Sequence, residues 1–479
     1  MRFTSIKCTL NEFCKNDYVK SKLNDITLNI NKIIFETYLL ANLHIIRLLD
    51  EGINIPALNQ GFFQNAIALT SKLYNRKEKK CNDSKLQDTF DCYKQTRPNS
   101  YKVGYRDFIT PILNYVAADM ETATLNHLVL NFYKRCTNYI RQNHPHLTKK
   151  QVYDVMKNVY SETYEGSDPI ALNIRNALGN IPPTEENVKK NPTPILNVYS
   201  KILTYSKANK LRLFSLLPTK NSFNMSHITI DKSALRDIIV EGQLLPGAKG
   251  EIRKYVAENP MDVFEHFFRV KKYETNRKKF VFFKTDGNAV SIVFKDEEGE
   301  QKKSRLKKKQ RDDVPAASEY DVSVGIDPGL RYLFVGKSNE NVDSKKETVR
   351  MSSKQYYHDC RFNWKVQKQQ QCYKKNQQWM DYSSNMPSNK TNDINELQHY
   401  LRHALNGLDM ALQLHVTNPF RKWKHKTYIF KQKTFHKILQ MITTKRTETD
   451  PKKVIVGFGN WGNPRDSIIR GHQRGLSRK

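Results

Sequence analysis

The spacing of apolar residues changes along this chain of 479 residues, and the change limits the folds that the chain can adopt. From about Asp25 to Lys210, apolar residues recur at intervals of three and four positions, as in Leu39, Leu43 and Ile46. This period is typical of amphipathic helices, whose apolar side chains line one face. Four prolines between residues 182 and 194 would end any helix that reaches them. The first part of the chain is therefore predicted to be an all-α lobe.

A strand pattern replaces the helical one near Phe280. Runs rich in Val, Ile and Phe lie on both sides of Asp286-Gly287. This pair suits a tight turn, because glycine adopts positive φ angles without steric cost. The segment is predicted to be a β-hairpin.

From Tyr320 onward, the pattern indicates strands followed by helices. The sequence YDVSVGIDPGLRYLFVGKS predicts two strands joined through Pro328-Gly329, and Glu347–Ser352 is expected to add a third. A final buried strand is expected to begin at Lys452. One helical face is predicted from the positions of Leu397, Leu401, Ala404, Leu408, Ala411 and Leu412. Strands and helices in this order predict an α/β architecture.

The chain is strongly basic, which points to a polyanionic partner. Lys and Arg number 80 and Asp and Glu number 48, so the net charge is +32. A hydrophobic content of 38% and an aromatic content of 11% indicate folded cores rather than a disordered tail. Phosphate binding commonly relieves charge repulsion of this size. A basic surface without a specific ligand is the alternative, and no basic amphipathic anchor suggests a membrane partner.

Asp327 is the residue in the C-terminal part that most clearly suggests chemistry. It ends an apolar strand, immediately before the turn at Pro328-Gly329. A carboxylate buried there would be costly without a cation or hydrogen-bond donors, so it suggests a ligand for a divalent metal. The alternative is that the side chain caps the turn. The spacing alone does not choose between these two roles.

Basic residues concentrate in the segment KKSRLKKKQR, which is expected to be an exposed linker. This segment is either a solvated charge run or a phosphate-contacting arm or nuclear import signal. Further basic residues follow Asp327, alternate with aromatic residues, or lie near the C-terminus. The candidate nucleic-acid contacts are Lys302, Lys303, Arg305, Lys307, Lys308, Lys309, Arg311, Arg331, Lys365, Lys374, Arg470 and Arg474.

Aromatic and basic side chains alternate in one segment of the C-terminal part. The residues are Arg361, Phe362, Trp364, Lys365, Tyr373, Lys374 and Trp379. Rings in such a setting can stack on bases or ribose. Packing in the core of an amphipathic helix is the alternative, and it is preferred for Phe362 and Trp364.

The cysteines and the N-terminus bear on the compartment of the protein. Seven cysteines without a CxxC pair are expected to be reduced thiols that form no zinc site. The N-terminus lacks the apolar core of a signal peptide. Polar and charged residues interrupt the apolar stretch from Ile33 to Leu49, which is expected to be a buried amphipathic helix and not a membrane span. A protein of the nucleus or cytoplasm, neither secreted nor transmembrane, is expected.

Four segments, in order along the chain, resemble the Fanzor family, the eukaryotic relatives of the TnpB RNA-guided nucleases. GIDPGLRYLFVG, from Gly325, is similar to the first RuvC motif, in which a glycine-led strand ends in the catalytic aspartate. FSLLPTKNSFNMSHITIDKSAL, from Phe214, resembles the segment between the helical recognition lobe and the wedge domain. FKTDGNAVSIVF, from Phe283, resembles the wedge-domain hairpin. VIVGFGNWG, from Val454, resembles the second RuvC strand of Fanzors.

This resemblance implies a multidomain α+β protein with an incomplete RNase H-like (RuvC) α/β domain. In that fold, the strand that ends in Asp327 would lie beside the strand from Val454 to Phe458. The implied parts are an N-terminal segment (1–24), a helical recognition-like lobe (25–213), a β-rich wedge-like domain (214–300), a basic linker (301–315) and a partial nuclease domain (316–479).

The resemblance also implies guide RNA and DNA as partners and Mg²⁺ as the cofactor for DNA hydrolysis. Catalysis would need two metal ions bridged by several carboxylates, and Asp327 is the one secure ligand. Where TnpB proteins have a glutamate at the end of the second strand, this chain has the residues Gly457 to Asn460, and it stops at Lys479 without an obvious replacement. Asp466 is a further candidate ligand, although pairing with a neighbouring arginine explains it more easily.

Three functions are compatible with these observations. The first is an RNA-guided nuclease whose C-terminal part is missing, and the second is a domesticated or decaying transposon-derived protein that binds nucleic acid without cutting it. The third is a structural chromatin protein, but a charge scaffold needs neither a hairpin nor an aspartate at a strand end. We expect binding that depends steeply on salt, and no cleavage.

Overall fold

Two compact units make up the structure. A computed structural model describes residues 2–73, 81, 83–220, 223–275, 278–296, 320–327, 329, 331–338, 348–442 and 454–459. Unit 1 contains Glu298–Gln377 and Pro419–Lys479, and unit 2 contains Arg2–Glu297 and Gln378–Asn418. The segment Gln378–Asn418 therefore folds with the N-terminal part of the chain, whereas the sequence-based boundaries place it in the nuclease-like domain.

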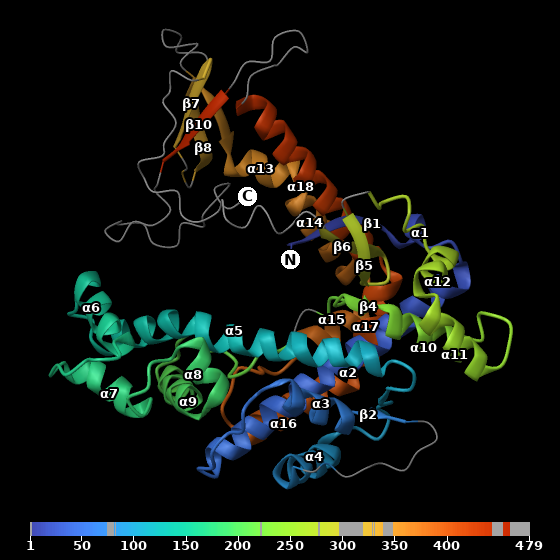
Figure 1. Cartoon of the computed structure of the whole chain (residues 1–479). Helices are drawn as coiled ribbons and strands as arrows, with labels where there is room; N and C mark the ends of the chain where they lie inside the picture. The colour runs from blue at the N-terminus through green and yellow to red at the C-terminus, as the bar shows by residue number, and fades with distance from the viewer. Residues whose placement is uncertain are drawn as a thin grey trace. The chain divides into compact units, whose positions relative to one another are not determined.

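Unit 2 is mainly helical, in keeping with the spacing of its apolar residues (Figure 1). Its helices are α1 (Leu10–Phe13), α2 (Asp17–Asp50), α3 (Gln60–Leu69), α4 (Ser84–Thr96), α5 (Thr110–Asn143), α6 (Lys149–Tyr160), α7 (Pro169–Ala177), α8 (Glu185–Lys190), α9 (Thr193–Ala208), α10 (Lys232–Gly242), α11 (Lys249–Glu258), α12 (Pro260–Phe267), α15 (Gln377–Ser384), α16 (Ile394–Asn406) and α17 (Leu408–Thr417). Its strands are β1 (Arg2–Thr9), β2 (Ser71–Lys72), β3 (Gly104–Tyr105), β4 (Ile228–Ile230), β5 (Lys278–Thr285) and β6 (Ala289–Asp296).

Helix α2 lies in the core of unit 2. Its residues 30–46 are all buried, including the polar ones, so the helix is enclosed on every side rather than along one face. Buried polar groups need partners. Glu36 accepts hydrogen bonds from the Arg97 guanidinium and from the Tyr101 hydroxyl, the latter at 2.9 Å.

Among the described helices, none combines the length and the apolar character that crossing a membrane requires.

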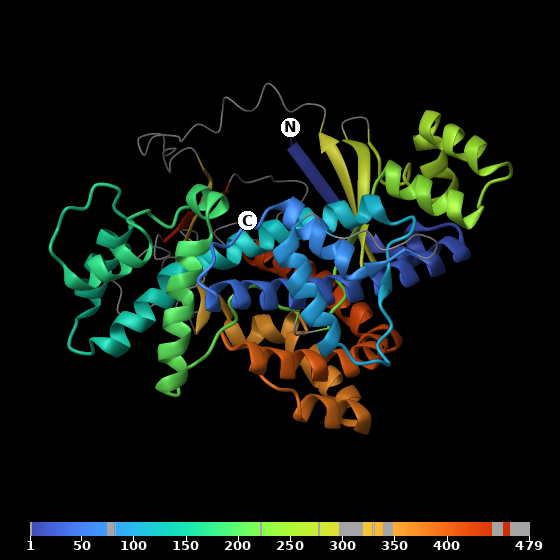
Figure 2. The ribbon, with the colours of Figure 1, turned by 90° about the horizontal axis from the view of Figure 1, so that it is seen from below.

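The predicted hairpin is confirmed within a four-stranded sheet of unit 2. β5 and β6 pair antiparallel, and Gly287 at the turn has a φ of +84°. The Asp286 carboxylate accepts the N–H groups of Asn288 at 3.1 Å and Ala289 at 2.9 Å, which stabilises the turn. The strand order is β1-β6-β5-β4, and the N-terminal strand lies beside the hairpin in Figure 2. The N-terminal segment therefore completes this sheet, which the sequence does not indicate.

The helical face predicted between residues 397 and 412 is buried, but it belongs to two helices, α16 and α17. Gly407 separates them. A Cβ at this position would lie 2.1 Å from a ring carbon of Tyr382, so the close approach of the ring requires glycine. The Tyr382 hydroxyl donates a hydrogen bond to the Ala404 carbonyl at 3.1 Å, which fixes the ring at this place.

Unit 1 contains a four-stranded sheet of order β10-β7-β8-β9. β7 pairs parallel with β10 and antiparallel with β8, and β8 pairs antiparallel with β9. The expected pairing of the strand that ends in Asp327 with the segment 454–458 is thus confirmed. The elements of this unit are β7 (Val322–Asp327), β8 (Tyr332–Ser338), β9 (Val349–Ser352), α13 (Ser353–Asp359), α14 (Phe362–Lys374), α18 (Phe420–Ile442) and β10 (Val454–Phe458).

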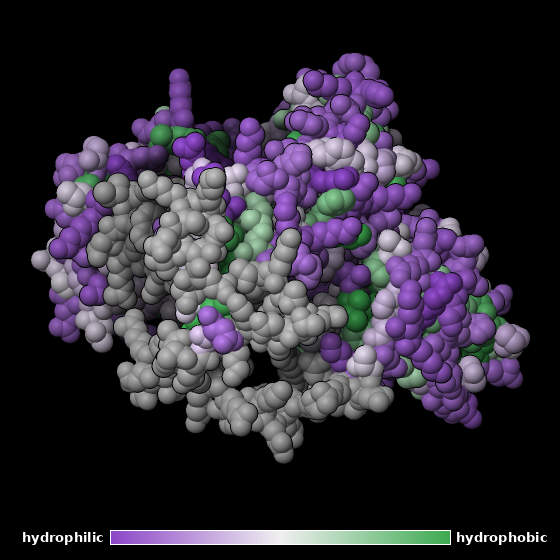
Figure 3. Space-filling model, turned by 90° about the horizontal axis from the view of Figure 1, so that it is seen from above, coloured by the Kyte–Doolittle hydropathy of each residue, from purple (hydrophilic) through white to green (hydrophobic). Residues whose placement is uncertain are grey.

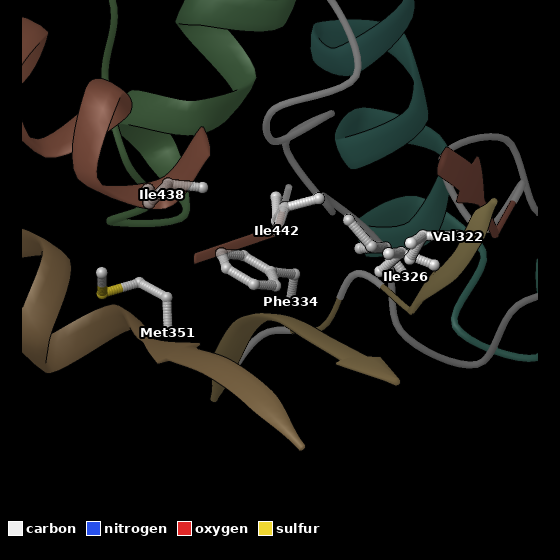
Figure 4. Close-up of a cluster of buried hydrophobic side chains, with 7 residues drawn as sticks. Val322, Ile326, Phe334, Met351, Ile438 and Ile442 are labelled. Atoms are coloured by element: carbon white, nitrogen blue, oxygen red, sulfur yellow. The ribbon is translucent and has the colours of Figure 1, made fainter. Parts of the chain in front are cut away.

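One face of this sheet packs against the C-terminal end of α18. Ile438 and Ile442 of α18 cover the apolar face, as Figure 4 shows. The buried strand residues beneath them are Val322, Val324, Ile326, Phe334 and Met351. β10 lies at the edge of the described sheet, and Val454 and Val456 are only partly buried. The predicted final strand is present from Val454 to Phe458, but the prediction that it is buried is wrong.

Candidate nucleic-acid interface

Asp327 is the last residue of β7, at the carboxyl end of a strand with neighbours on both sides. Side chains alternate between the two faces of a strand. Ile326 is therefore buried in the core, and Asp327 is exposed on the opposite face. The carboxylate is therefore not buried, contrary to the expectation from the sequence. Because it is exposed to water, its charge needs no bound cation for compensation. Its exposure leaves it accessible to a ligand.

Two arginines, Arg331 before β8 and Arg350 in β9, lie in the same sheet region as Asp327. Asp327 is paired with Val335 of β8, and Val335 is paired with Arg350 of β9. Directly opposed residues share a face and adjacent strands lie about 4.8 Å apart, so Arg350 is roughly 10 Å from Asp327 on the same face. The guanidinium groups of Arg331 and Arg350 lie 5.9 Å and 5.7 Å from the centroid of the Tyr332 ring. Both arginines are exposed, so they are accessible to phosphate groups.

The sheet face beside Asp327 lacks a side chain at two paired positions. Gly325 of β7 is paired with Gly457 of β10, and a Cβ on either residue would meet no atom within 4 Å. The Gly459 N–H donates to the Ile326 carbonyl at 2.8 Å, which extends the pairing beyond the last residue of β10. At the two paired glycines, no side chain of β7 or β10 would keep a polymer backbone away from this face.

The described residues do not fit a site for two magnesium ions. Among them, no group of three or more His, Cys, Asp or Glu side chains is placed to hold a metal ion. A two-metal site needs several carboxylates. Asp327 is the only candidate ligand in the described part of the chain, because Asp466 lies outside it. One exposed carboxylate does not satisfy the Mg²⁺ pair that the resemblance implies.

The predicted basic contacts fall partly outside the described residues. This applies to the candidates from Lys302 to Arg311 and to the two C-terminal arginines. Arg331 is exposed at the start of β8. Lys365 and Lys374 both belong to α14, where Lys365 is half-buried and Lys374 is exposed. The structure therefore places Arg331 four residues after Asp327, at the start of β8, and it places the two lysines on another element, nine residues apart on opposite sides of α14.

The aromatic candidates pack against other rings, in two different settings. Phe362 and Trp364 pack against other rings, as preferred, but neither is fully buried, because α14 contains no buried residue. Trp364 makes a T-shaped contact with Trp423 of α18, with 5.9 Å between the ring centroids. Trp379 is buried in unit 2, where its ring lies 5.7 Å from that of Phe223. Trp379 is therefore not available for base stacking.

Helix α18 is a basic element that the sequence reasoning does not single out. It carries seven Lys and Arg residues and no Asp or Glu. A signal exists in the sequence, because no Asp or Glu occurs between Asp409 and Glu448. This positive charge is distributed along 23 residues, so it is less conspicuous than the compact run KKSRLKKKQR.

In comparisons with known proteins, no protein-family model matches this chain and no curated protein is significantly similar to it. Its function must therefore be inferred from its charge and from the geometry of unit 1.

Proposed function

We propose that this protein binds nucleic acid and that unit 1 is related to the RuvC-like domain of Fanzor and TnpB RNA-guided nucleases. The observation that carries the proposal is the position of Asp327. It ends β7, which lies between the parallel strand β10 and the antiparallel strand β8. This arrangement agrees with the strand neighbours expected of an RNase H-like sheet. The proposed partners are guide RNA and DNA, in the nucleus or cytoplasm.

The charge of the chain supports an RNA–DNA duplex as the ligand. RNA-guided proteins hold the duplex through its backbone and shape, whereas base pairing with the guide reads the sequence. Backbone binding needs many cationic side chains, and the net charge here is +32. The exposed Arg331 and Arg350 add local positive charge near Asp327.

We infer further that the 479-residue chain binds without cutting. Hydrolysis of a phosphodiester by this class of enzyme requires metal ions held by several carboxylates. Asp327 is the single candidate ligand among the described residues, and they contain no metal-binding group of three or more side chains. Binding depends only on basic surface, so it does not require that site.

Binding and cleavage are tested separately with the full chain. Fluorescence anisotropy measures the affinity for a labelled RNA–DNA hybrid of about 20 base pairs. The affinity is expected to fall roughly a thousandfold between about 50 and 200 mM salt, because each neutralised phosphate releases counterions. Neither the wild-type protein nor an Asp327→Ala variant should cleave DNA in Mg²⁺, and the two should bind the hybrid equally well.

Two results would contradict parts of this proposal. A hybrid that binds no more tightly than heparin would indicate a basic surface without a specific ligand. Mg²⁺-dependent cleavage that disappears in the Asp327→Ala variant would show that the chain completes a nuclease site, and the inference that it does not cut would be wrong.

A further inference from the structure

Helices α14 and α18 form the most uniformly charged pair of neighbouring helices in unit 1. α14 carries three lysines, α18 carries seven Lys and Arg residues, and neither helix contains Asp or Glu. The nearest acidic residue in the adjoining helix α13 is Asp359, which accepts hydrogen bonds from Lys437 at 3.2 Å and Gln355 at 2.6 Å. Asp359 is the only Asp or Glu in these three helices, so basic residues far outnumber acidic ones in them.

Four lysines of α18 lie in one row on its exposed side. The buried residues of the helix are Phe420, Thr427, Thr434, Ile438 and Ile442. At 100° per residue, the opposite side contains Lys422, Lys426, Lys433 and Lys437, all of them exposed. With a rise of 1.5 Å per residue, this lysine row is about 22 Å long. One strand of a duplex has a phosphate every ~3.4 Å along the axis, so the row spans about six phosphates.

Helix α14 supports the row through ring contacts. Tyr373, at the end of α14, has its ring centroid 5.3 Å from that of Phe420, at the start of α18. The Arg361 guanidinium, at the start of α14, lies 3.7 Å from the centroid of the Phe430 ring. The two helices therefore run antiparallel.

The aromatic rings of α14 and α18 pack against each other. Trp364 contacts Trp423 with 5.9 Å between the centroids, and the Lys426 ammonium lies 5.3 Å from the Trp364 ring. A ring held between neighbouring side chains is a poor platform for stacking bases. The surface is suited to phosphate contacts, which do not depend on base identity.

Like charges also meet within the pair. Burial lowers the pKa of Lys365, and the positive charge of Lys424 lowers it further. Repulsion between these like charges is unfavourable, and an anion bound on the exposed side of the two helices would reduce it. Most of the coloured surface in Figure 3 is hydrophilic.

We propose that the lysine row on α18, supported by α14, binds the phosphate backbone of an RNA–DNA or DNA duplex without stacking on its bases or reading them. The inference rests on the proposed function, because it requires a nucleic-acid partner. It assigns backbone binding to a surface about a hundred residues after Asp327 in the sequence. Binding of the backbone would then not depend on the Asp327 carboxylate.

The test compares two variants of the full chain with equal net charge. The row variant replaces Lys422, Lys426, Lys433 and Lys437 with Gln. The control variant replaces four exposed lysines of unit 2 with Gln, namely Lys150, Lys157, Lys201 and Lys254. Affinity for a labelled RNA–DNA hybrid is measured by anisotropy at several salt concentrations, and circular dichroism checks that both variants are folded.

The row variant is expected to bind at least about tenfold more weakly than the control. The slope of log K against log salt should be smaller by about 3, because Lys437 already pairs with Asp359. Arginine at the same four positions should restore binding, and two hybrids of unrelated sequence should bind within about twofold of each other. Equal binding by the row and control variants would overturn this inference alone. Absence of binding by the wild-type protein would instead overturn the proposed function.

Discussion

Gly325 and Gly329 lie on either side of Asp327, and each is a glycine for a different reason. A Cβ on Gly325 would meet no atom within 4 Å, so the strand itself has room for a side chain there. A Cβ on Gly329 would lie 2.9 Å from the Tyr332 carbonyl oxygen, which is backbone and cannot rotate away. Gly329 is thus needed by the turn, whereas Gly325 leaves the exposed face without a side chain at its position.

Alanine substitutions should separate these two roles. Gly329→Ala is expected to lower the free energy of unfolding by more than about 1 kcal/mol, because its native backbone conformation leaves no room for a methyl group. Gly325→Ala is expected to leave it unchanged or raise it by up to about 1 kcal/mol, because alanine reduces the freedom of the unfolded chain. Urea denaturation measures both values, and equal losses would contradict this distinction.

At the residue scale, the sequence predicts the position of Asp327 but not its environment. The end of a strand is a local property, since apolar spacing and the following Pro-Gly pair define it. Whether the far face of that strand is covered depends on distant segments, and the sequence pattern does not contain that information. The exposure of Asp327 and the half-burial of Lys365 on α14 belong to this second kind of property.

At the element scale, the contact between Gly407 and Tyr382 determines where one predicted helix becomes two. Gly407→Ala is expected to lower the free energy of unfolding by about 1–3 kcal/mol, because the added methyl group overpacks the site. Replacing Tyr382 with Ala as well should remove the clash, so the double variant should lose less stability than the sum of the two single variants. Additive losses in chemical denaturation would show that the ring does not set this requirement.

Elements that depend on neighbouring residues are predicted best. The hairpin at Asp286-Gly287 is correct because the turn residues and the flanking strands are adjacent in sequence. The break at Gly407 is not predicted, because Tyr382 lies 25 positions earlier in the sequence and reaches it only in the fold. For the same reason, the spacing of β10 suggests a buried strand but does not reveal that it is an edge strand of the described sheet.

At the scale of the whole molecule, three histidines link the stability of unit 2 to pH. Burial lowers the pKa of His44, His127 and His415 to about 4. An unfolded histidine titrates near ~6.5, so between about pH 6.5 and 4 the unfolded chain binds protons that the folded chain excludes. The free energy of unfolding is therefore expected to fall as the pH is lowered through this range, and no further contribution is lost below about pH 4.

The expected loss is on the order of 3 kcal/mol for a fully buried histidine, since each pKa unit corresponds to about 1.4 kcal/mol. Urea denaturation at about pH 7.5, 6 and 5 measures the trend. A His44→Gln variant should show a shallower decline than the wild-type protein. Stability that is constant across this range would contradict the prediction.

The division of the molecule into units is the property least accessible from the sequence. Apolar spacing predicts the buried face of the segment 397–412, but it does not say against which element that face packs. Within unit 2, the Lys32 ammonium and the Asp409 carboxylate approach to 2.5 Å, and Lys207 and Glu396 approach to 2.6 Å. Contacts between residues so distant in sequence assign this segment to the N-terminal lobe.

This discontinuous arrangement determines how the protein can be dissected. The chain passes from one unit to the other after residues 297, 377 and 418. A single proteolytic cut between residues 297 and 320 therefore leaves only the segment Gln378–Asn418 of unit 2 covalently joined to unit 1. A fragment that ends before residue 320 would lack α15–α17, whose buried side chains belong to the core of the lobe. Neither unit corresponds to one continuous stretch of sequence. To replace a unit with its counterpart from a related protein, two segments of the chain would have to be exchanged together.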